Sequence, residues 1–592
     1  MSALTLLADP NTARVLLPEF TLVVGIVLMI LVPNIGKGTF RLPIPNTNIR
    51  LPYLLGGERF ALTSSPRVPG IIGVVTLLFS ISLALWSQAS TPLTDYNVWC
   101  ITTSGEAYSS CLGMTESTLL RVDGFSRLLE VLFYGSLMLT GVATWSRLPA
   151  TPRNLIHSQK LAGPHEDERI QQLLDNRRQV DFHLLLLMVA LGMSVVVLAN
   201  DLFVLFVGLE LASLAIYVLV SFMKEESTGP EAGMKYFIVG SVSSAIGLYG
   251  ISLLYLWNGS LDISDLSASW AAMETIDPLA LVGLAFVLVV IGFKVSAAPF
   301  HLAAPDAYSG ASAPIAGMLA TASKAMGFVV LLRVLVTITM PESGSAFWVG
   351  TVGIIAAVTM TWGNLGALSS DNPKRMLAYS SVAHAGYLLA AVAALGVNSS
   401  RVGDHDISQL LVAAILFHLV VLVLFKLGAF LVITMLETEG RGSRVEDFYG
   451  LAKREPLIAL AMIVFMLSLA GVPPLSGFLS KMLLVSGVID ASVHHTMSFD
   501  DGLVAAARSL HWIFWLALLV FLNSALSLFY YLRVGWVMFF EEPPTKRRMV
   551  YAPFLRIAIM CCLLGTLAFG IGPLADHLIT LVSNAATAFL QS

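Results

Sequence analysis

Several ionisable side chains of this 592-residue chain lie inside long apolar runs, where they could bind protons and pass them on. Lys294 stands in the run GFKVSAAPFHL, which Pro299 interrupts and in which His301 follows the interruption. Lys324 lies near the middle of the next apolar run. Ionisable groups at membrane depth are energetically costly and tend to mark the paths of ions or protons. A broken helix at that depth must face protein or a water-filled cavity, so residues 292–333 predict part of a proton path.

Glu210, in the run FVGLELASL, is the acidic candidate. It lies about 13 Å along its predicted helix at 1.5 Å per residue. A lone buried glutamate can be neutral and hydrogen-bonded, but here lysines stand on the neighbouring predicted helices. Burial alone favours the neutral forms of both residue types, whereas pairing favours the charged forms. A Glu210–Lys294 pair that forms and separates would therefore act as a protonation switch.

Two further lysines each allow two interpretations. Lys235, in AGMKYF, lies just inside the start of its helix and is either part of the path or an anchor whose ammonium reaches the membrane surface. Lys481 lies toward the outer end of its helix and is either the exit group of the path or a similar anchor.

Histidines supply candidate relay groups, because imidazole titrates near neutral pH. His301 beside the helix break is the strongest of them, whereas His384 and His418 are as consistent with hydrogen-bonded core residues as with relay groups. Lys426, eight residues after His418, is assigned to the relay. Glu130 is interpreted as a structural residue.

The composition places most of the chain in lipid. It is 56% hydrophobic and only 12% charged, whereas soluble proteins carry about 25% charged residues. The sequence has neither a Cys/His cluster with metal spacing nor a GxGxxG or GxxxxGK[ST] loop, so any redox cofactor is expected elsewhere. Cys100 and Cys111 could form a disulfide in one polar loop, whereas Cys561 and Cys562 are interpreted as core residues.

The apolar runs predict an all-α polytopic membrane protein, since about 20 apolar residues cross a bilayer. Fourteen helices are expected, at residues 14–33, 68–87, 125–145, 181–199, 202–222, 233–257, 278–302, 311–336, 346–368, 375–396, 408–436, 457–489, 511–539 and 554–573. The tail 574–592 is expected to extend the last helix.

Lysines and arginines concentrate in the loops that follow odd-numbered helices, and the other loops are mostly acidic. Loops rich in positive charge stay on the cytoplasmic side. The pattern predicts an even number of crossings in a bacterial inner membrane, with both termini on the periplasmic side.

Helices 7 and 12 are both expected to be discontinuous, at KVSAAPFHL and at LAGVPPLSGFLSKM. They lie five helices apart, and matching interruptions in two halves indicate inverted repeats with the site between them. The predicted parts are residues 1–180 (helices 1–3), 181–336 (first repeat), 346–539 (second repeat) and 540–592 (helix 14 and tail).

Two long runs resemble the antiporter-like membrane subunits of complex I, the proton-pumping NADH:quinone oxidoreductase. They are GFKVSAAPFHLAAPDAYSGASAPIAGMLATASKAMGF and GNLGALSSDNPKRMLAYSSVAHAGYLL, and GLELASL, LPEF and SLFYYLRV match one branch of the family. Lys426 and the long loops 34–67, 88–124 and 146–180 depart from that branch.

The resemblance implies a fold of fourteen helices with two inverted five-helix repeats, and proton translocation driven by quinone reduction elsewhere in a complex. It gives proton-carrying roles to Glu210, Lys235, Lys294, Lys324 and Lys481. It places NADH, FMN, iron–sulfur clusters and quinone in partner subunits. The partners it implies are the antiporter-like siblings L and M, small subunits such as K and J, and the lipid bilayer, without nucleic acid.

Two other functions stay open on the sequence. The chain could be a subunit of a multisubunit cation/proton antiporter, which shares the fold and the lysines. It could also be a membrane scaffold in which the buried lysines have no transport role. The quinone, the electron source and the proton stoichiometry are not encoded in any recognisable motif.

Overall fold

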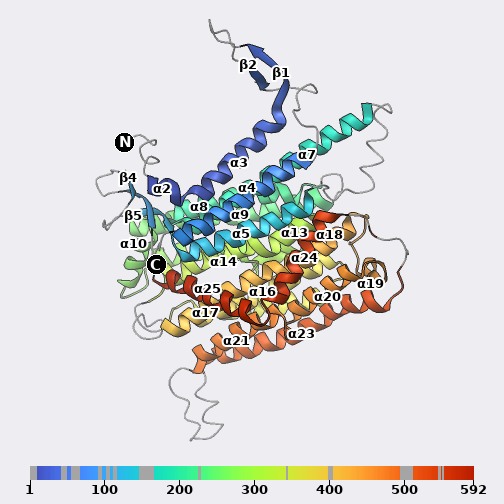
Figure 1. Ribbon diagram of the computed structural model, residues 1–592. Coiled ribbons are helices and arrows are strands. Elements are labelled where there is room, and N and C mark those ends of the chain that lie inside the picture. The colour runs from blue at the N-terminus through green and yellow to red at the C-terminus, as the bar shows by residue number, and fades with distance from the viewer. Residues whose placement is uncertain are drawn as a thin grey trace.

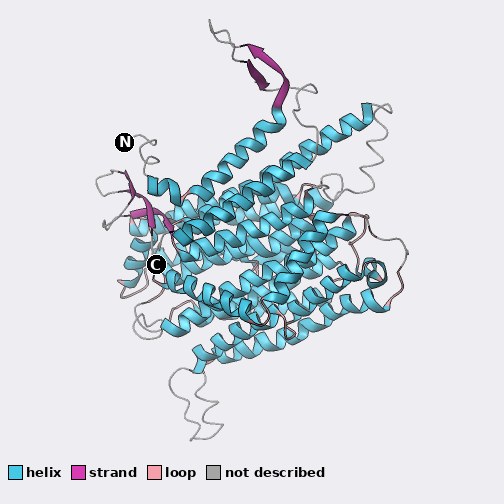
Figure 2. Cartoon of the chain, in the orientation of Figure 1, coloured by secondary structure: helices cyan, strands magenta, loops and turns pink. Residues whose placement is uncertain are grey.

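The computed structural model describes residues 10–41, 50–54, 67–90, 96–101, 107–110, 117–145, 166–223, 228–341, 345–397, 405–493, 511–543, 549 and 552–591. Within these ranges the chain is a bundle of long helices that run roughly side by side (Figures 1 and 2). Strand β1 (Ile35–Arg41) pairs with β2 (Arg50–Leu54), and β3 (Tyr96–Ile101) lies between β4 (Ala107–Ser110) and β5 (Ser117–Val122), all antiparallel.

Among its described residues, the first half of the chain is mostly helical and also contains all five strands. Its elements are α2 (Pro10–Val15), α3 (Leu17–Asn34), α4 (Arg67–Ser90), α5 (Gly124–Thr144), α7 (Glu166–Leu198), α8 (Leu202–Val220), α9 (Thr228–Asn258), α10 (Ile263–Ala271), α11 (Pro278–Val295), the 3₁₀ turn η1 (Phe300–Leu302), α12 (Ala303–Gly310), α13 (Ala313–Met318), the π-helical η2 (Leu319–Ser323), α14 (Lys324–Leu332) and the π-helical η3 (Arg333–Ile338).

The second half continues in the same way. Its elements are α15 (Val349–Leu368), α16 (Pro373–Leu395), α17 (His405–Leu422), the π-helical η4 (Val423–Leu427), α18 (Gly428–Glu437), the 3₁₀ turn η5 (Val445–Phe448), α19 (Leu451–Arg454), α20 (Pro456–Ala470), α21 (Ser476–Val493), α23 (Ile513–Phe540), α24 (Pro553–Ala568) and α25 (Pro573–Leu590).

Asparagine or aspartate caps fix where several long helices begin. At α5, Asp123 accepts a hydrogen bond from the Ser126 backbone N–H (2.7 Å), and the Ser126 hydroxyl accepts from the Asp123 N–H (2.9 Å). Asp201 caps α8 and Asn372 caps α16 in the same manner, each through two backbone N–H groups. These side chains satisfy donors that the helix itself leaves unpaired, so each helix has a defined first residue.

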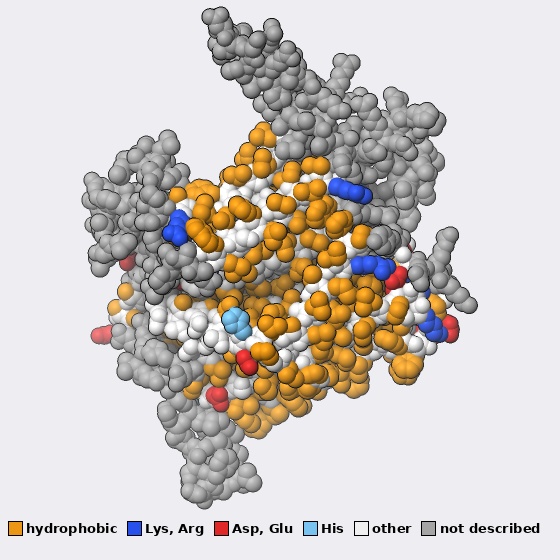
Figure 3. All heavy atoms as spheres, viewed as in Figure 1, with side chains coloured by type: hydrophobic (Ala, Val, Ile, Leu, Met, Phe, Trp, Pro, Cys, Tyr) orange, Lys and Arg blue, Asp and Glu red, His pale blue; other side chains and the backbone are white. Residues whose placement is uncertain are grey.

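The helices from α13 to η3 and α16 form the centre of the bundle, where almost every residue is buried. In contrast, α4, α9, α15 and α23 expose large apolar side chains on their outer faces. Figure 3 shows such side chains covering much of the visible flank of the bundle, with most of the charged groups toward its margins. A continuous apolar belt of this kind is stable in lipid and not in water.

Each apolar run that predicted a helix contains one in the structure. Among the described residues, eleven helices are long and apolar enough to cross a membrane, or twelve when the bent pair α24 and α25 is counted as one span. Two shorter apolar helices, Leu17–Leu31 and α20, accompany them. The predicted discontinuities are present: helix 7 is divided between α11 and α12, and helix 12 between α20 and α21.

The chain departs from the predictions at its end and in its loops. The tail does not extend the last helix, because α25 is a separate helix bent by 87° from α24. Gly572 between them has φ +96° and Pro573 follows, so regular helical hydrogen bonding stops there. The two small sheets were not expected in an all-α chain, and the short helix α10 lies in a segment where no helix was expected. The possible disulfide between Cys100 and Cys111 is not tested, because Cys111 lies outside the described residues.

The helices α15 and α16 cross at glycines. A Cβ atom placed on Gly386 of α16 would lie 2.5 Å from the backbone nitrogen of Met360 on α15. Gly363 of α15 has the same relation to the backbone nitrogen of Ala383. Because backbone atoms cannot move aside as a flexible side chain does, these two positions require the absence of a side chain.

We expect Gly386→Ala to lower the free energy of unfolding by about 1–3 kcal/mol, because the added methyl must push the two helices apart. The midpoint of thermal unfolding of the purified protein in detergent measures this change. Gly135→Ala on α5 is the matched control, because a Cβ there meets nothing within 4 Å. Equal midpoints for the two variants would show that the crossing tolerates a methyl group.

Candidate functional site

Lys294 lies at the point where α11 stops. Ser296 takes a left-handed conformation (φ +59°), and the N–H groups of Ser296 and Ala297 close the helix on the carbonyls of Phe293 and Gly292. The Lys294 side chain is buried and donates a hydrogen bond to the Ser213 hydroxyl of α8. Its ammonium also lies 5.4 Å from the centroids of the Tyr217 and Phe293 rings, whose π faces attract a cation.

Glu210 lies on the same helix as Ser213, one turn earlier. Its carboxylate accepts a hydrogen bond from Ser244 of α9 at 2.6 Å. No ion pair within 4 Å joins Glu210 to Lys294, both of which are described, but the two side chains interact electrostatically. Ser213 therefore holds the Lys294 ammonium one helical turn away from the carboxylate that could pair with it.

Lys324 begins α14, directly after the π-helical turn η2, and is 1% exposed. Its ammonium donates to the Val295 carbonyl (3.2 Å) and to the Ser381 carbonyl of α16 (2.8 Å). A helix end leaves its last carbonyls without intrahelical partners. The break after Val295 thus supplies an acceptor for a buried ammonium of the neighbouring helix.

Two histidines lie one turn beyond Ser381, between α16 and α17. His384 Nδ1 is 3.1 Å from His418 Nε2, and His418 Nδ1 is 3.1 Å from the Ser480 hydroxyl of α21. On the other side, the Tyr531 hydroxyl of α23 is 3.5 Å from His384 Nε2. In such a chain each imidazole can donate through one nitrogen and accept through the other.

Lys481 follows Ser480 and ends this row of polar groups. It is buried, and its ammonium donates to the carbonyls of Leu469 (2.8 Å) and Ala470 (3.1 Å) and to the Ser524 hydroxyl (2.8 Å). These carbonyls are exposed by the break between α20 and α21, where Gly471 has φ +85°. The second break, like the first, therefore provides backbone carbonyls that accept hydrogen bonds from a buried lysine.

Lys426 lies between the two lysines just described and differs from both. It belongs to the π-helical η4 and is fully buried, and its ammonium has no hydrogen-bond partner within the described parts of the chain. It interacts electrostatically with Lys324 and Lys481. π-Helical turns occur frequently at functional sites, since they displace one side chain from the regular helical register.

Two predicted residues lie apart from this row. Lys235 is half-exposed and pairs with Glu231 (2.7 Å) and with Asp306 of α12 (3.4 Å), which also pairs with Arg375 (3.2 Å). His301 is buried against the Trp362 ring at 5.6 Å, and neither of its ring nitrogens has a partner among the described residues.

The structure thus brings together Lys294, Lys324, His384, His418, Lys426 and Lys481, with Glu210 beside the first of them. The connecting groups Ser213, Ser381, Ser480 and Ser524, and Tyr531 in the motif SLFYYLRV, were not identified from the sequence. Serines of helical membrane segments are too common to be singled out by type. Their roles depend on the two breaks and on the register of the helices that face them.

Chemically, the row alternates amines and imidazoles with hydroxyls and free carbonyls. Lysine and histidine can each bind and release a proton, and hydroxyl groups can donate and accept hydrogen bonds at the same time. Within the described residues no group of three His, Cys, Asp or Glu side chains could hold a metal ion. The arrangement is suited to moving protons through an apolar interior.

Comparisons with known proteins agree with this description. Residues 199–506 match the family described as "NADH:quinone oxidoreductase/Mrp antiporter, TM". Subunit N of NADH-quinone oxidoreductase from Heliobacterium modesticaldum is 38% identical over 402 residues, which cover 68% of this chain and 77% of that protein.

Two solved structures are similar over almost the whole chain. A chain of respiratory complex I from Thermus thermophilus with bound Aureothin has a TM-score of 0.61 and 25% identity, and the match covers 95% of this chain and 96% of that one. A chain of the Mrp complex from Dietzia sp. DQ12-45-1b has a TM-score of 0.71, with 98% of each chain covered. Its identity is 20%, so it shows the fold alone.

The chain belongs to the NADH:quinone oxidoreductase/Mrp antiporter family of membrane subunits. Several relatives within that family, at 34–38% identity, are subunit N of NADH-quinone oxidoreductase. Subunit N is also the branch that the motifs GLELASL, LPEF and SLFYYLRV resemble. The resemblance inferred from the sequence is therefore confirmed.

We expect Lys426→Met to raise the midpoint of thermal unfolding, since it removes a buried ammonium without a partner at nearly constant volume. Replacing buried charge by an apolar side chain has stabilised other proteins by about 1–4 kcal/mol. The matched variant Lys324→Met should instead be neutral or destabilising, because it leaves two carbonyls without their donor. A lower midpoint for Lys426→Met than for Lys324→Met would contradict this account.

Proposed function

We propose that the chain is the proton-translocating membrane subunit N of an NADH:quinone oxidoreductase of the complex I type. The observation that carries this proposal is the buried row of lysines and histidines that connects the two helix breaks. NADH, FMN, iron–sulfur clusters and quinone belong to partner subunits, and this chain performs no redox step. Its neighbours are the antiporter-like siblings L and M and small membrane subunits such as K and J.

In the proposed mechanism Lys294 acts as the switch. When it turns from Ser213 toward Glu210, the ion pair favours the charged lysine, and when it returns it loses that stabilisation. The resulting change in electrostatic potential favours proton transfer from Lys324 through His384 and His418 toward Lys481.

The remaining ionisable groups have supporting roles in this proposal. Lys426 adds a positive charge to the middle of the row, where the interaction between like charges disfavours simultaneous protonation of its neighbours. Lys481 is the exit group. Lys235, paired with Asp306 at the surface, lies at the proton entrance, and His301 relays protons beside the first break.

We also propose the finer architecture that this function requires. The two shorter apolar helices and the bent pair cross the membrane, which gives fourteen spans. Residues 1–180 precede two inverted repeats, 181–336 and 346–539, and residues 540–592 complete the bundle. The matching lysine–carbonyl contacts at the two breaks support this division. In the bacterial inner membrane both termini lie on the periplasmic side, as the loop charges indicate.

The description of the matching family, which names Mrp antiporters beside the oxidoreductase, favours one alternative, a subunit of a cation/proton antiporter. Sodium-dependent proton exchange by membrane vesicles that contain this chain, without NADH dehydrogenase subunits in the purified assembly, would support that alternative. Proton uptake driven by NADH and independent of sodium would support the principal proposal.

We expect Lys294→Ala to reduce coupled proton pumping roughly tenfold or more, since the removal of a positioned proton-transfer group has effects of at least this size. The assembly should remain intact, because the lysine contacts hydroxyls and rings rather than a buried carboxylate. Proton uptake by inverted membrane vesicles after addition of NADH, relative to quinone reduction in the same vesicles, measures the effect.

Lys453→Ala is the control for Lys294→Ala. Its side chain is 49% exposed and pairs with Glu542 on the surface, so pumping should be unchanged. Lys235→Ala separates the two interpretations of that residue. A loss of pumping assigns it to the entrance, whereas behaviour like that of Lys453→Ala assigns it to the membrane surface. Full pumping by Lys294→Ala would refute the switch.

A further inference from the structure

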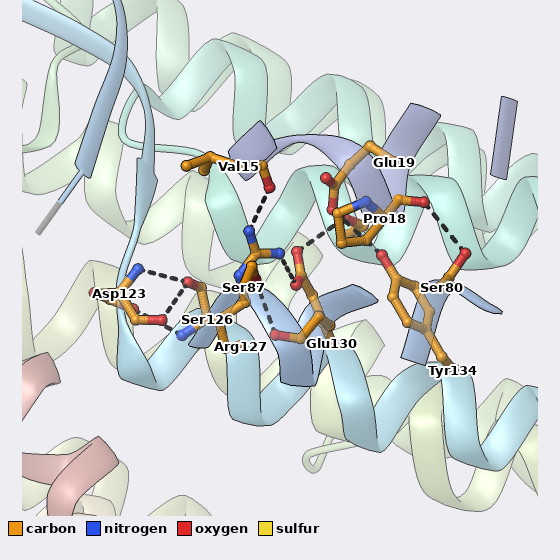
Figure 4. Close-up of polar contacts among 12 residues, drawn as sticks. Val15, Pro18, Glu19, Ser80, Ser87, Asp123, Ser126, Arg127, Glu130 and Tyr134 are labelled. Carbon is orange, nitrogen blue, oxygen red and sulfur yellow. Dashed lines mark hydrogen bonds and ion pairs between the residues drawn. The ribbon is translucent and has the colours of Figure 1, made fainter. Parts of the chain in front are cut away.

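A second cluster of buried ionisable groups lies outside the row, between α3, α5 and α7. It consists of Glu19 on α3 and of Arg127, Glu130 and Tyr134 on α5 (Figure 4). Ser194 on α7 completes it. Arg127 and Glu130 are 1% and 0% exposed, and Glu19 is 9% exposed. No step of the proposed mechanism uses these residues.

The cluster contains two carboxyl groups but a single cation, Arg127. Arg127 Nη1 donates to Glu130 Oε2 at 2.5 Å, and Nη2 donates to the backbone carbonyl of Val15. Among the described residues, the donors to Glu19 are two neutral hydroxyls, those of Tyr134 (3.3 Å) and Ser194 (2.7 Å), both on Oε1. Its Oε2 is buried without a partner in the described part of the chain. Two carboxylates therefore share one guanidinium, which leaves one negative charge in an apolar interior.

The number of hydrogens available for hydrogen bonds also indicates that the cluster lacks one proton. Ser194 Oγ lies 2.7 Å from Glu19 Oε1 and 3.3 Å from Glu130 Oε1, but a serine hydroxyl carries a single hydrogen. If Ser194 donates to one carboxylate, its contact with the other lacks a hydrogen. A proton on either Glu19 or Glu130 supplies that hydrogen and removes the excess charge. Two carboxyl groups that share a site hold a proton for the same reason in other proteins.

The charged groups on the surrounding elements are occupied elsewhere. Arg14 of α2 stacks over the Trp86 ring of α4 at 4.7 Å, and Arg121 of β5 lies 3.9 Å from Asp123. Arg333 of η3 donates to the Val197 carbonyl at 2.6 Å. The hydroxyl of Ser80 on α4 donates to the Pro18 carbonyl.

The cluster lies close to one end of the bundle. Glu130 is seven residues from the cap Asp123, or about 10 Å along the helix, and Ser194 is in the last turns of α7. Those helix ends meet β5 through the bridge between Leu120 and Ala199. A proton bound between the two glutamates is therefore only a few helical turns from the surface that carries β5.

We propose that Glu19 and Glu130 form a proton-binding site that holds one exchangeable proton, shared through Ser194 and covered by Arg127. Binding converts one carboxylate to a carboxylic acid and breaks no other bond. Release leaves a net negative charge beside Arg127, so the occupancy of the site sets the charge between α3 and α5. This inference does not depend on the proposed function.

Infrared spectroscopy of the purified full-length protein in its membrane assembly at neutral pH tests the proposal. The carbonyl stretch of a protonated carboxyl should be present and should shift in D₂O. Either Glu19→Gln or Glu130→Gln should abolish this band, because the remaining carboxylate then pairs with Arg127 as an ion. Glu455→Gln is the control and should leave the band unchanged, since Glu455 pairs with Arg556 at 3.0 Å outside the cluster.

Ser194→Ala serves if a glutamine variant does not assemble. It keeps both carboxyls and removes the shared hydroxyl, so the band should persist at a changed frequency. A band that survives both glutamine variants, or does not move in Ser194→Ala or in D₂O, overturns the proposal. A band that develops only in sodium-free potassium buffer also overturns it, because sodium would then be the occupant.

Discussion

A buried ammonium requires oxygen acceptors, whereas most backbone carbonyls of regular helices already accept a hydrogen bond within their own helix. This constraint governs the centre of the structure. Helix breaks after Val295 and after Ala470 free carbonyl groups at membrane depth, and Lys324 and Lys481 donate to them. The freed carbonyls therefore accept the hydrogen bonds that the buried ammonium groups need to donate, and both kinds of group are satisfied. Without the breaks, Lys324 would keep only the Ser381 carbonyl and Lys481 only the Ser524 hydroxyl. Without the lysines, the carbonyls at the breaks would lose a charged donor.

The two breaks use this solution in different ways. At the first, the lysine comes from the helix that packs beside the break, and Lys294 on the broken helix itself turns to Ser213. At the second, the lysine lies on the broken helix, two turns past the interruption, and Ser524 completes its contacts. The first break leaves Lys294 held by a hydroxyl and facing a carboxylate, whereas the second holds its lysine with three acceptors. A change of hydrogen-bond partner is thus expected at Lys294 rather than at Lys481.

The sequence predicted the helical segments, both interruptions and most of the ionisable groups in the row, because apolar length, proline and buried charge are visible in residue types. It did not predict the bend at Gly572, the small sheets or the π-helical turns that precede Lys324 and contain Lys426. Such turns depend on packing between helices. The Glu19–Glu130 cluster was missed for a similar reason: Glu130 was interpreted as structural, and its partners lie on helices distant in sequence.

The row and the cluster have opposite charge balances. The row holds four lysines, Lys294, Lys324, Lys426 and Lys481, and one partly buried acid, Glu210, beside the first of them. In the cluster, two acids accompany Arg127. Groups of like charge that interact in a medium of low dielectric constant cannot all be ionised at once. Their protons are therefore bound and lost as a coupled set. In the row, this coupling means that a proton gained by one lysine disfavours a proton on the next. In the proposed mechanism, repulsion along the row, rather than a gradient of intrinsic affinity, gives proton movement its direction once Lys294 changes partner.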